Sequence, residues 1–267
     1  LLSEIISLDW NFIQKLDDLD DRLQHFWSPI NHLHAVKQTA KLRLAYNECL
    51  AKISAYSSEL SQNSRLYQSI KTLDKKKYRF NYAQKKCLHN ELRDFHLGGI
   101  DLPKAKQKRY QVIQAQLAQL SNQFEENLLD ATANWSKCIS DKSELKGLPT
   151  YIIASAEKAA KDKNMSGCLL SLDYPCYFPV LSYADNRALR ESVYKAYITR
   201  ASEFGNMAFD NSPIMFKILN LRHELSQLLG FKNYAQKSLA SNKMAKTPEE
   251  VLSFLENLLR CTQSKAD

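Results

Sequence analysis

The chain has 267 residues, 44% of them hydrophobic and 25% charged, and its formal net charge at pH 7 is +8. These proportions are typical of a soluble globular protein, and the length allows one large domain or two smaller ones. No apolar run approaches the roughly 20 residues that a membrane-spanning helix requires, so no membrane partner is expected. Only six glycines and seven prolines occur, and this scarcity favours helices.

The six cysteines are widely scattered, and no pair has the C-x-x-C spacing of a zinc knuckle or a redox motif. A mostly helical chain of this size does not need disulfides, so we expect reduced thiols and a cytoplasmic location. The chain opens on Leu1-Leu2-Ser3-Glu4, without a starting methionine or the basic region of a signal peptide. We therefore expect it to be a piece of a longer protein.

The first part of the chain is predicted to be an array of helices. Leu1 to Phe26 indicates the first of them. Ser28-Pro29 predicts the start of the next, because serine caps a helix and proline is tolerated in its first turn. Further helices are expected over Leu42 to Leu60 and Ser64 to Leu73.

A helix, a glycine break and one very long amphipathic helix are predicted between Phe80 and Trp135. The first helix, around Tyr82 to Phe95, should end at Gly98-Gly99, because glycine adopts the left-handed conformation that closes a helix. From Tyr110 to Trp135 apolar residues recur every three or four positions, which predicts a helix of roughly 38 Å. A helix of this length needs a large helical body to pack against.

The pattern changes near Gly147-Leu148-Pro149. A short helix is predicted at Tyr151 to Ala160. Two proline-flanked runs rich in Leu, Val, Tyr and Phe then come, at Leu169 to Pro175 and at Tyr177 to Tyr183. They predict two short strands, and so at most one small two-stranded β element near residues 168–183.

Three helices complete the predicted fold. One begins at Asp185, and the next begins at Ser212-Pro213 and stops at Gly230. Thr247-Pro248-Glu249-Glu250 is a capping box that starts the last helix, which runs toward Arg260. The chain is thus predicted to be mainly α, a packed array of long antiparallel helices. We expect one helical region at residues 1–146 and a second at 147–267, which includes the β element.

The strongest candidate for chemistry is His223-Glu224, with Gln227 four positions after the histidine. Zinc peptidases use H-E-x-x-H, in which two histidines four positions apart on a helix face one metal ion. Gln227 occupies the second histidine position, and its amide is a poor zinc ligand. His223 also lies opposite the apolar stripe that contains Leu225, so it should face solvent or a neighbouring domain. Zinc binding is therefore not predicted here.

The other histidines and the acidic patch also fit a structural interpretation better. The histidines do not share a helical face as ligands must, and the patch lacks the turn glycine of a calcium loop. These residues are His25, His32, His34, His89 and His96, and Asp17, Asp18, Asp20 and Asp21. The chain also lacks a phosphate-binding glycine loop and a nucleophile elbow.

The segment from Lys71 to Tyr110 contains twelve Lys and Arg and four Asp and Glu. Its net charge of +8 equals the net charge of the whole chain. Tyr78, Phe80 and Tyr82 are interleaved with these cations, as on surfaces that bind nucleic acid. No RNA- or DNA-binding motif accompanies the charge. The preferred interpretation is a solvated helix face whose lysine stems cover apolar surface.

A series of short motifs occurs in order along the chain. They are Phe26-Trp27-Ser28-Pro29, Ala83-Gln84-Lys85-Lys86, Leu92-Arg93-Asp94-Phe95, Gly98-Gly99-Ile100, Leu102-Pro103-Lys104, Leu128-Leu129-Asp130-Ala131-Thr132, Pro179-Val180-Leu181-Ser182-Tyr183, Tyr197-Ile198-Thr199-Arg200-Ala201-Ser202, Leu221-Arg222-His223-Glu224-Leu225, Leu229-Gly230-Phe231 and Asn233-Tyr234-Ala235. Together they resemble the N-terminal half of the thimet-oligopeptidase family of zinc metallopeptidases. The resemblance covers essentially the whole chain.

This resemblance implies a cytosolic zinc peptidase that cuts short peptides. In the family, a helical N-terminal region forms one wall of a deep channel that admits short unstructured peptides and excludes folded proteins. The zinc site lies further along the chain, in a C-terminal catalytic domain on the other wall. No catalytic or zinc-binding residue of the family maps onto any position here, so none is assigned, and the substrate-contacting residues are left open. By this interpretation the isolated chain is inactive. The rival is a non-enzymatic helical module that uses residues 71–110 to bind RNA or an acidic protein.

Overall fold

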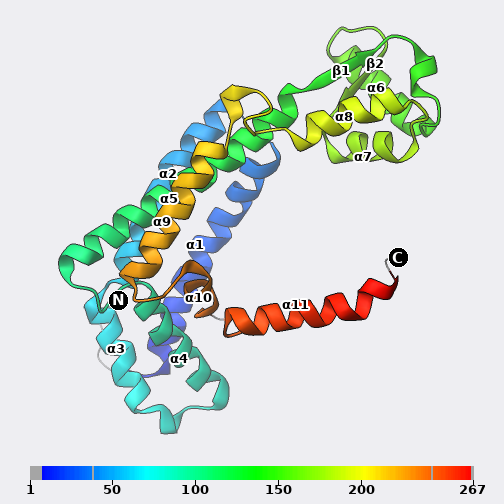
Figure 1. Cartoon of the computed structure of the whole chain (residues 1–267). Coiled ribbons are helices and arrows are strands. Elements are labelled where there is room, and N and C mark those ends of the chain that lie inside the picture. The colour runs from blue at the N-terminus through cyan, green and yellow to red at the C-terminus, as the bar shows by residue number, and fades with distance from the viewer. Residues whose placement is uncertain (1–7, 38, 242, 266–267) are drawn as a thin grey trace. The chain divides into compact units, whose positions relative to one another are not determined.

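The computed structural model describes residues 8–37, 39–241 and 243–265. Within them lie eleven α-helices and one two-stranded antiparallel sheet, which confirms the predicted mainly α fold (Figure 1). The chain forms two compact units, one of residues 1–119 with 219–267 and the other of residues 120–218. The predicted boundary at residues 146–147 falls inside the second unit and stays a prediction.

The first unit is entirely helical in the residues that the structure describes. Its helices are α1 (Trp10–Val36), α2 (Ala40–Ser61), α3 (Ser64–Lys75), α4 (Tyr82–Leu97), α10 (Tyr234–Leu239) and α11 (Pro248–Thr262), with the first part of α5 (Lys104–Asn134) and the last part of α9 (Ser212–Leu228). The long helix predicted up to Trp135 is α5, and it ends one residue earlier.

The helix ends are determined by local chemistry. Asn81 and Gln84 form a reciprocal capping box at the start of α4, each side chain accepting a hydrogen bond from the backbone N–H of the other. Gly99, with φ of 82°, comes after α4, and Gly230, with φ of 83°, comes after α9. Both glycines adopt the left-handed conformation, as predicted from their places just after the apolar periodicity.

A buried glutamine network fixes the break between α4 and α5. A side chain at Gly98 would place its Cβ 2.6 Å from Cβ of Ser61, so α2 can approach the break only at a glycine. Gln62 Nε2 donates a hydrogen bond to Gly98 O at 3.2 Å, and Gln107 Nε2 donates to Ile100 O at 3.0 Å. Both glutamines are buried, and these bonds satisfy backbone carbonyls that the break would leave unpaired.

The predicted helix start at Ser28-Pro29 is wrong, because α1 continues through Pro29. Proline already has the helical φ, and inside a helix it removes its own N–H from the hydrogen-bond ladder and crowds the carbonyl of the preceding turn. Tyr46 of α2 holds α1 on both sides of the proline. Its ring stacks on Trp27 at 4.9 Å and on His34 at 3.8 Å between ring centroids, and its hydroxyl donates to Asn31 Oδ1 at 2.7 Å.

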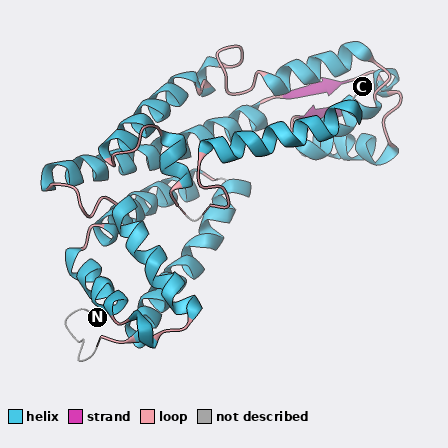
Figure 2. Cartoon of the chain, turned by 60° about the horizontal axis from the view of Figure 1, so that its bottom comes forward, coloured by secondary structure: helices cyan, strands magenta, loops and turns pink. Residues whose placement is uncertain are grey.

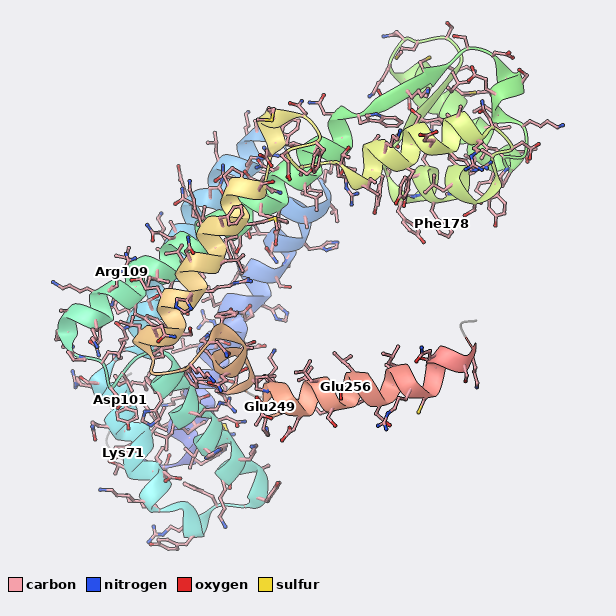
Figure 3. All side chains as sticks on the ribbon, viewed as in Figure 1. Lys71, Asp101, Arg109, Phe178, Glu249 and Glu256 are labelled. Carbon is pink, nitrogen blue, oxygen red and sulfur yellow. The ribbon has the colours of Figure 1, made fainter. Side chains whose placement is uncertain are left out.

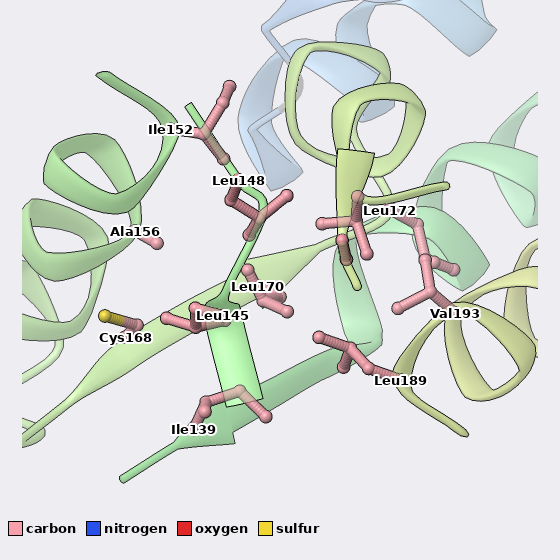
Figure 4. Packing of buried hydrophobic residues seen from close by; sticks show 12 residues of the cluster. Ile139, Leu145, Leu148, Ile152, Ala156, Cys168, Leu170, Leu172, Leu189 and Val193 are labelled. Atoms are coloured by element: carbon pink, nitrogen blue, oxygen red, sulfur yellow. The ribbon is translucent and has the colours of Figure 1, made fainter. Parts of the chain in front are cut away.

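The second unit contains the sheet. Strands β1 (Ser136–Ile139) and β2 (Cys168–Ser171) pair antiparallel, with Ser136 opposite Ser171 and Ile139 opposite Cys168 (Figure 2). Three helices accompany it, α6 (Thr150–Asp162), α7 (Tyr174–Tyr183) and α8 (Arg187–Ile198). Buried side chains from the strands, the helices and the loop before α6 form one apolar core, which Figure 4 shows around Leu145, Leu170, Leu189 and Val193.

The strand predicted at Tyr177 to Tyr183 is wrong, because this segment belongs to α7. The partner of β2 is instead β1, a segment directly after the long helix for which no strand was predicted. Pro175 lies in the first turn of α7, and Pro179 has a φ compatible with a helix. Val180 is fully buried, and the Tyr177 ring stacks on Tyr197 of α8 at 3.6 Å. These contacts are spaced three residues apart, which is a helical and not a strand period.

Candidate functional site

The zinc-like motif His223-Glu224 has a structural role in α9. His223 is exposed, as expected. The guanidinium of Arg109 in α5 donates to both carboxylate oxygens of Glu224, at 2.5 Å from Nε and 2.6 Å from Nη2 (Figure 3 labels Arg109). This bidentate bond lowers the pKa of Glu224 and raises the pKa of Arg109. Gln227 Nε2 donates to Lys232 O at 3.0 Å, just beyond the end of the helix.

The other histidines are separated in the fold. His25, His32 and His89 are exposed on α1 and α4. His34 is buried against Tyr46. His96 Nδ1 contacts Asp101 Oδ2, and both side chains are exposed. In the described ranges, no three His, Cys, Asp or Glu side chains gather where they could hold a metal ion.

Apart from Lys77, whose side chain lies outside the described set, the cations of the segment Lys71 to Tyr110 are largely exposed. Lys71 lies over the ring of Tyr67 at 5.4 Å, and Arg93 pairs with Asp94 at 2.8 Å. Tyr78 is 72% exposed and Tyr82 85% exposed, so both rings are open to solvent beside the cations. The surface has the solvated helix face that the sequence predicted. The rings of Tyr78 and Tyr82 do not pack on the core, whereas Phe80 packs against it beside Trp10.

The acidic patch meets a second set of carboxylates that the sequence did not bring together. Asp17 and Asp20 of α1 share the lining of a cavity of about 270 Å³ with Glu91 and Asp94 of α4. Desolvation raises the pKa of Asp17 and of Glu91, and the neighbouring carboxylates raise both further. No periodicity links residues 74 positions apart, so only the packing of α1 against α4 reveals this group.

Helix α11 presents an apolar face without cover from the described residues. Thr247 caps it, accepting a hydrogen bond from Glu250 N at 3.2 Å. The predicted capping box is only half formed, because the Glu250 carboxylate accepts from Lys246 N at 2.7 Å and not from Thr247 N. None of the residues of α11 is buried. Glu249 and Glu256, both labelled in Figure 3, are seven positions apart and therefore share one side of the helix, which is polar. Leu252, Phe254, Leu255, Leu258 and Leu259, which recur every one to three residues on the other side, are each about half exposed or more. A contiguous apolar face of this kind is typical of an interaction surface.

Comparisons with known proteins match most of the chain. A family model described as the N-terminal domain of neurolysin and thimet oligopeptidase matches residues 2–107, and one described as peptidase family M3 matches residues 180–266. Oligopeptidase A of Salmonella typhimurium is 50% identical over 254 residues, and that of Escherichia coli is 49% identical over the same length. Both alignments cover 94% of this chain. The chain belongs to the thimet-oligopeptidase family.

Within the thimet-oligopeptidase family, the matches fit an N-terminal portion. The chain spans 37% of the length of both bacterial relatives. A protein of Arabidopsis thaliana named probable cytosolic oligopeptidase A is 36% identical over 96% of this chain and 37% of its own length. Among the described residues of this family member, no helix combines the length and the apolar character that a membrane crossing requires.

Proposed function

We propose that this chain is the channel-forming, substrate-restricting N-terminal portion of a zinc metallo-oligopeptidase that hydrolyses short peptides. The observation that carries the proposal is the identity of about 50% to proteins named oligopeptidase A, over 94% of this chain and 37% of theirs. The helical array supplies one wall of the channel, and short peptides are the substrates of the whole protein.

The motif at residues 223–227 does not fit a catalytic zinc site. Glu224, the residue that would activate a metal-bound water, is held by Arg109. Gln227 stands at the position of the second histidine, and its amide already donates to Lys232 O. We therefore place the zinc ligands outside this chain, in a C-terminal catalytic domain, and expect the isolated chain to be inactive.

That catalytic domain is the proposed cover for the apolar face of α11. The match to peptidase family M3 covers residues 180–266 and therefore includes α11. We take α11 to belong to the same family region as the rest of the peptidase, which supports contact with it. Burial of Phe254 and its apolar neighbours against the catalytic domain would remove them from water. We propose a cytoplasmic location, with neither membrane nor nucleic acid as a partner.

Cleavage of a fluorescence-quenched peptide of about ten residues tests the proposal. The protein expressed from the complete reading frame should cleave it, and a chelator should abolish the activity. This chain alone should be inactive, and addition of the separately expressed remainder should restore cleavage. The same peptide sequence placed within a folded protein should not be cleaved. Chelator-sensitive cleavage by this chain alone would overturn the proposal.

A second candidate function is binding of RNA or an acidic protein by residues 71–110. The exposed rings of Tyr78 and Tyr82 beside the cations favour it, since exposed aromatics stack on bases. This function requires an affinity for single-stranded RNA that falls steeply with salt, with a slope set by the number of phosphates neutralised. If the chain does not bind RNA, or if its affinity for RNA does not depend on salt, this second candidate function is wrong.

A further inference from the structure

A pocket of about 360 Å³ lies within the second unit, where α8 ends. Its walls come from the end of α5, the end of α8 and the loop that leads to the 3₁₀ turn Met207–Phe209. Polar and aromatic side chains both line it, and they include Asn134, Trp135, Thr199, Arg200, Asn206 and Phe209. This volume and mixture of side chains are typical of a small-molecule site.

The Arg200 guanidinium is held in one orientation. Its Nη1 donates a hydrogen bond to Tyr197 O, and its central carbon lies 3.5 Å from the centroid of the Tyr197 ring. The Tyr197 ring stacks in turn on Tyr177, with 3.6 Å between centroids. When a guanidinium stacks on an aromatic ring, its N–H groups point outward in the guanidinium plane, where they can donate hydrogen bonds.

Arg200 has a donor with no acceptor. Its Nε is buried and makes no hydrogen bond, and in the part of the chain that the structure describes no carboxylate pairs with it. A buried donor without a partner is unfavourable, and more so on a charged group. The pocket therefore contains a positive charge whose complement is not among its own residues.

The loop around Arg200 is tightly constrained. Ala201 has a left-handed φ of 52°, and its carbonyl accepts a hydrogen bond from Asn211 N at 3.1 Å. At Gly205 a Cβ would collide with Thr199 O, so the loop closes on the end of α8 only because a glycine stands there. A loop fixed in this way preorganises the pocket before any ligand binds.

We propose that this pocket binds the terminal carboxylate of a short peptide. A carboxylate complements the charge of the Arg200 guanidinium and would accept a hydrogen bond from Nη2, because Nε is enclosed and Nη1 already donates to Tyr197 O. Trp135 and Phe209 offer apolar surface to the last side chain of the peptide. Asn206 Oδ1 accepts from Ala208 N at 3.0 Å, which leaves its amide N–H groups for a peptide carbonyl. The choice of a peptide, in place of another carboxylate, rests on the proposed function.

Calorimetric titration of this chain with N-acetyl-glycyl-leucine and with its C-terminal amide tests the site. The acid should bind, and the amide should bind roughly 10- to 100-fold more weakly, because it lacks the charged pair. Arg200→Gln should weaken binding of the acid by the same factor, and Arg200→Lys by less. Arg187→Gln is the matched control, since it removes an equal charge from the exposed start of α8, the helix that ends just before Arg200. It should leave binding unchanged.

Asn206→Asp gives a second test that leaves Arg200 in place. Aspartate can still accept from Ala208 N, so the turn is kept, and its charge should repel the acid and weaken its binding. If Arg200→Gln fails to fold, judged by circular dichroism, this variant and the comparison of acid with amide decide the question.

Equal binding of acid and amide, or unchanged binding in Arg200→Gln and Asn206→Asp, overturns the proposal. Tighter binding of inorganic phosphate than of the acetylated dipeptide also overturns it, and assigns the pocket to phosphate. Peptide cleavage by the longer protein is measured separately. If the longer protein cleaves peptides but this chain does not bind the acid, only the proposal of this carboxylate site is overturned. If this chain binds the acid but the longer protein does not cleave peptides, only the proposed peptidase function is overturned.

Discussion

Arg109 and Glu224 join α5 to α9 through two parallel hydrogen bonds of 2.5 and 2.6 Å, although 115 positions separate them in the chain. Both side chains are about four-tenths exposed, at 43% and 42%. Apolar side chains beside them, including Tyr110, Ile113 and Leu225, form a small core between the same two helices. The glutamate of a zinc-like motif is therefore part of helix packing.

Glu224→Gln should reduce stability slightly and only where the carboxylate is charged. The pKa of Glu224 is lowered in the folded state, so its contribution is present above the unfolded value of about 4.3. It is lost as the pH falls through the folded pKa. Urea denaturation at pH 7 and at pH 3 measures the effect, and Arg109→Gln should remove most of it. Glu256→Gln on exposed α11 is the control. A fall in the zinc content of the longer protein caused by Glu224→Gln would contradict the structural role.

Glu91→Gln should raise stability at neutral pH. Desolvation and the charges of Asp17, Asp94 and Asp20 raise the pKa of Glu91, so the folded state binds its proton more tightly than the unfolded state does. Stability is therefore lost as the pH rises from about 4.3 through the raised folded value.

Thermal unfolding of Glu91→Gln and of wild type between pH 3 and pH 8 measures this difference. The variant should have the higher Tm at pH 7, and the gap should close near pH 3. Glu48→Gln, at an exposed position of α2, should have no such gap. A lower Tm for Glu91→Gln at pH 7 would show that its charge is stabilising.

Alanine substitutions at two glycines distinguish the cost of backbone strain from the cost of a steric clash. Gly230 has φ of 83° and open space around its Cα, so Gly230→Ala should reduce stability by about 1–2 kcal/mol, the cost of a left-handed alanine. Gly147 has φ of 89°, and a Cβ there would collide with the backbone carbonyl of Tyr183. Gly147→Ala should therefore be clearly more destabilising in urea denaturation. Equal losses would show that the loop before α6 relaxes freely.

Leu88→Ala should destabilise the first unit by about 2–5 kcal/mol, because Leu88 is fully buried among Ile70, Leu73 and Phe95 and leaves a cavity. Lys85→Ala, on the exposed side of the same helix, should change stability by no more than about 0.5 kcal/mol. Urea denaturation followed by circular dichroism measures both. Similar losses for the two variants would contradict the assignment of this core.

Leu255→Glu with Leu259→Glu should leave the stability of this chain nearly unchanged, because both side chains are exposed, at 50% and 60%. The double variant should bind less of a hydrophobic dye than wild type does. It should also fail to restore cleavage when mixed with the separately expressed remainder of the protein. Glu249→Gln with Glu256→Gln, on the polar side of α11, is the matched control. Normal restoration by the leucine variants would argue that another surface meets the catalytic domain.

Helices with strong end signals could be predicted from the sequence. Gly99 comes after α4, Gly230 comes after α9 and Thr247 starts α11, because each acts within a few residues of the helix end. The strand β1 could not be predicted, because Ser136–Ile139 is short and half polar and pairs with residues about thirty positions later. Helical contacts outweighed the strand propensity of Tyr177 and Val180 in α7.

The candidate pocket depended even more on distant contacts. Arg200 was visible only as part of a family motif, and no local pattern marks it as a binding residue. Its exceptional feature is an unpaired buried Nε, which arises from packing among α5, α8 and the 3₁₀ turn. Trp135, which also lines the pocket, was predicted only to end a helix.

The most direct test of the central claim is the zinc content of the protein expressed from the complete reading frame, measured by atomic absorption beside this 267-residue chain. If this chain supplies a channel wall, the longer protein should hold one zinc ion per molecule and this chain none, with Glu224→Gln unchanged in both. Stoichiometric zinc in this chain alone, reduced by substitution of His223 or Glu224, would contradict that claim.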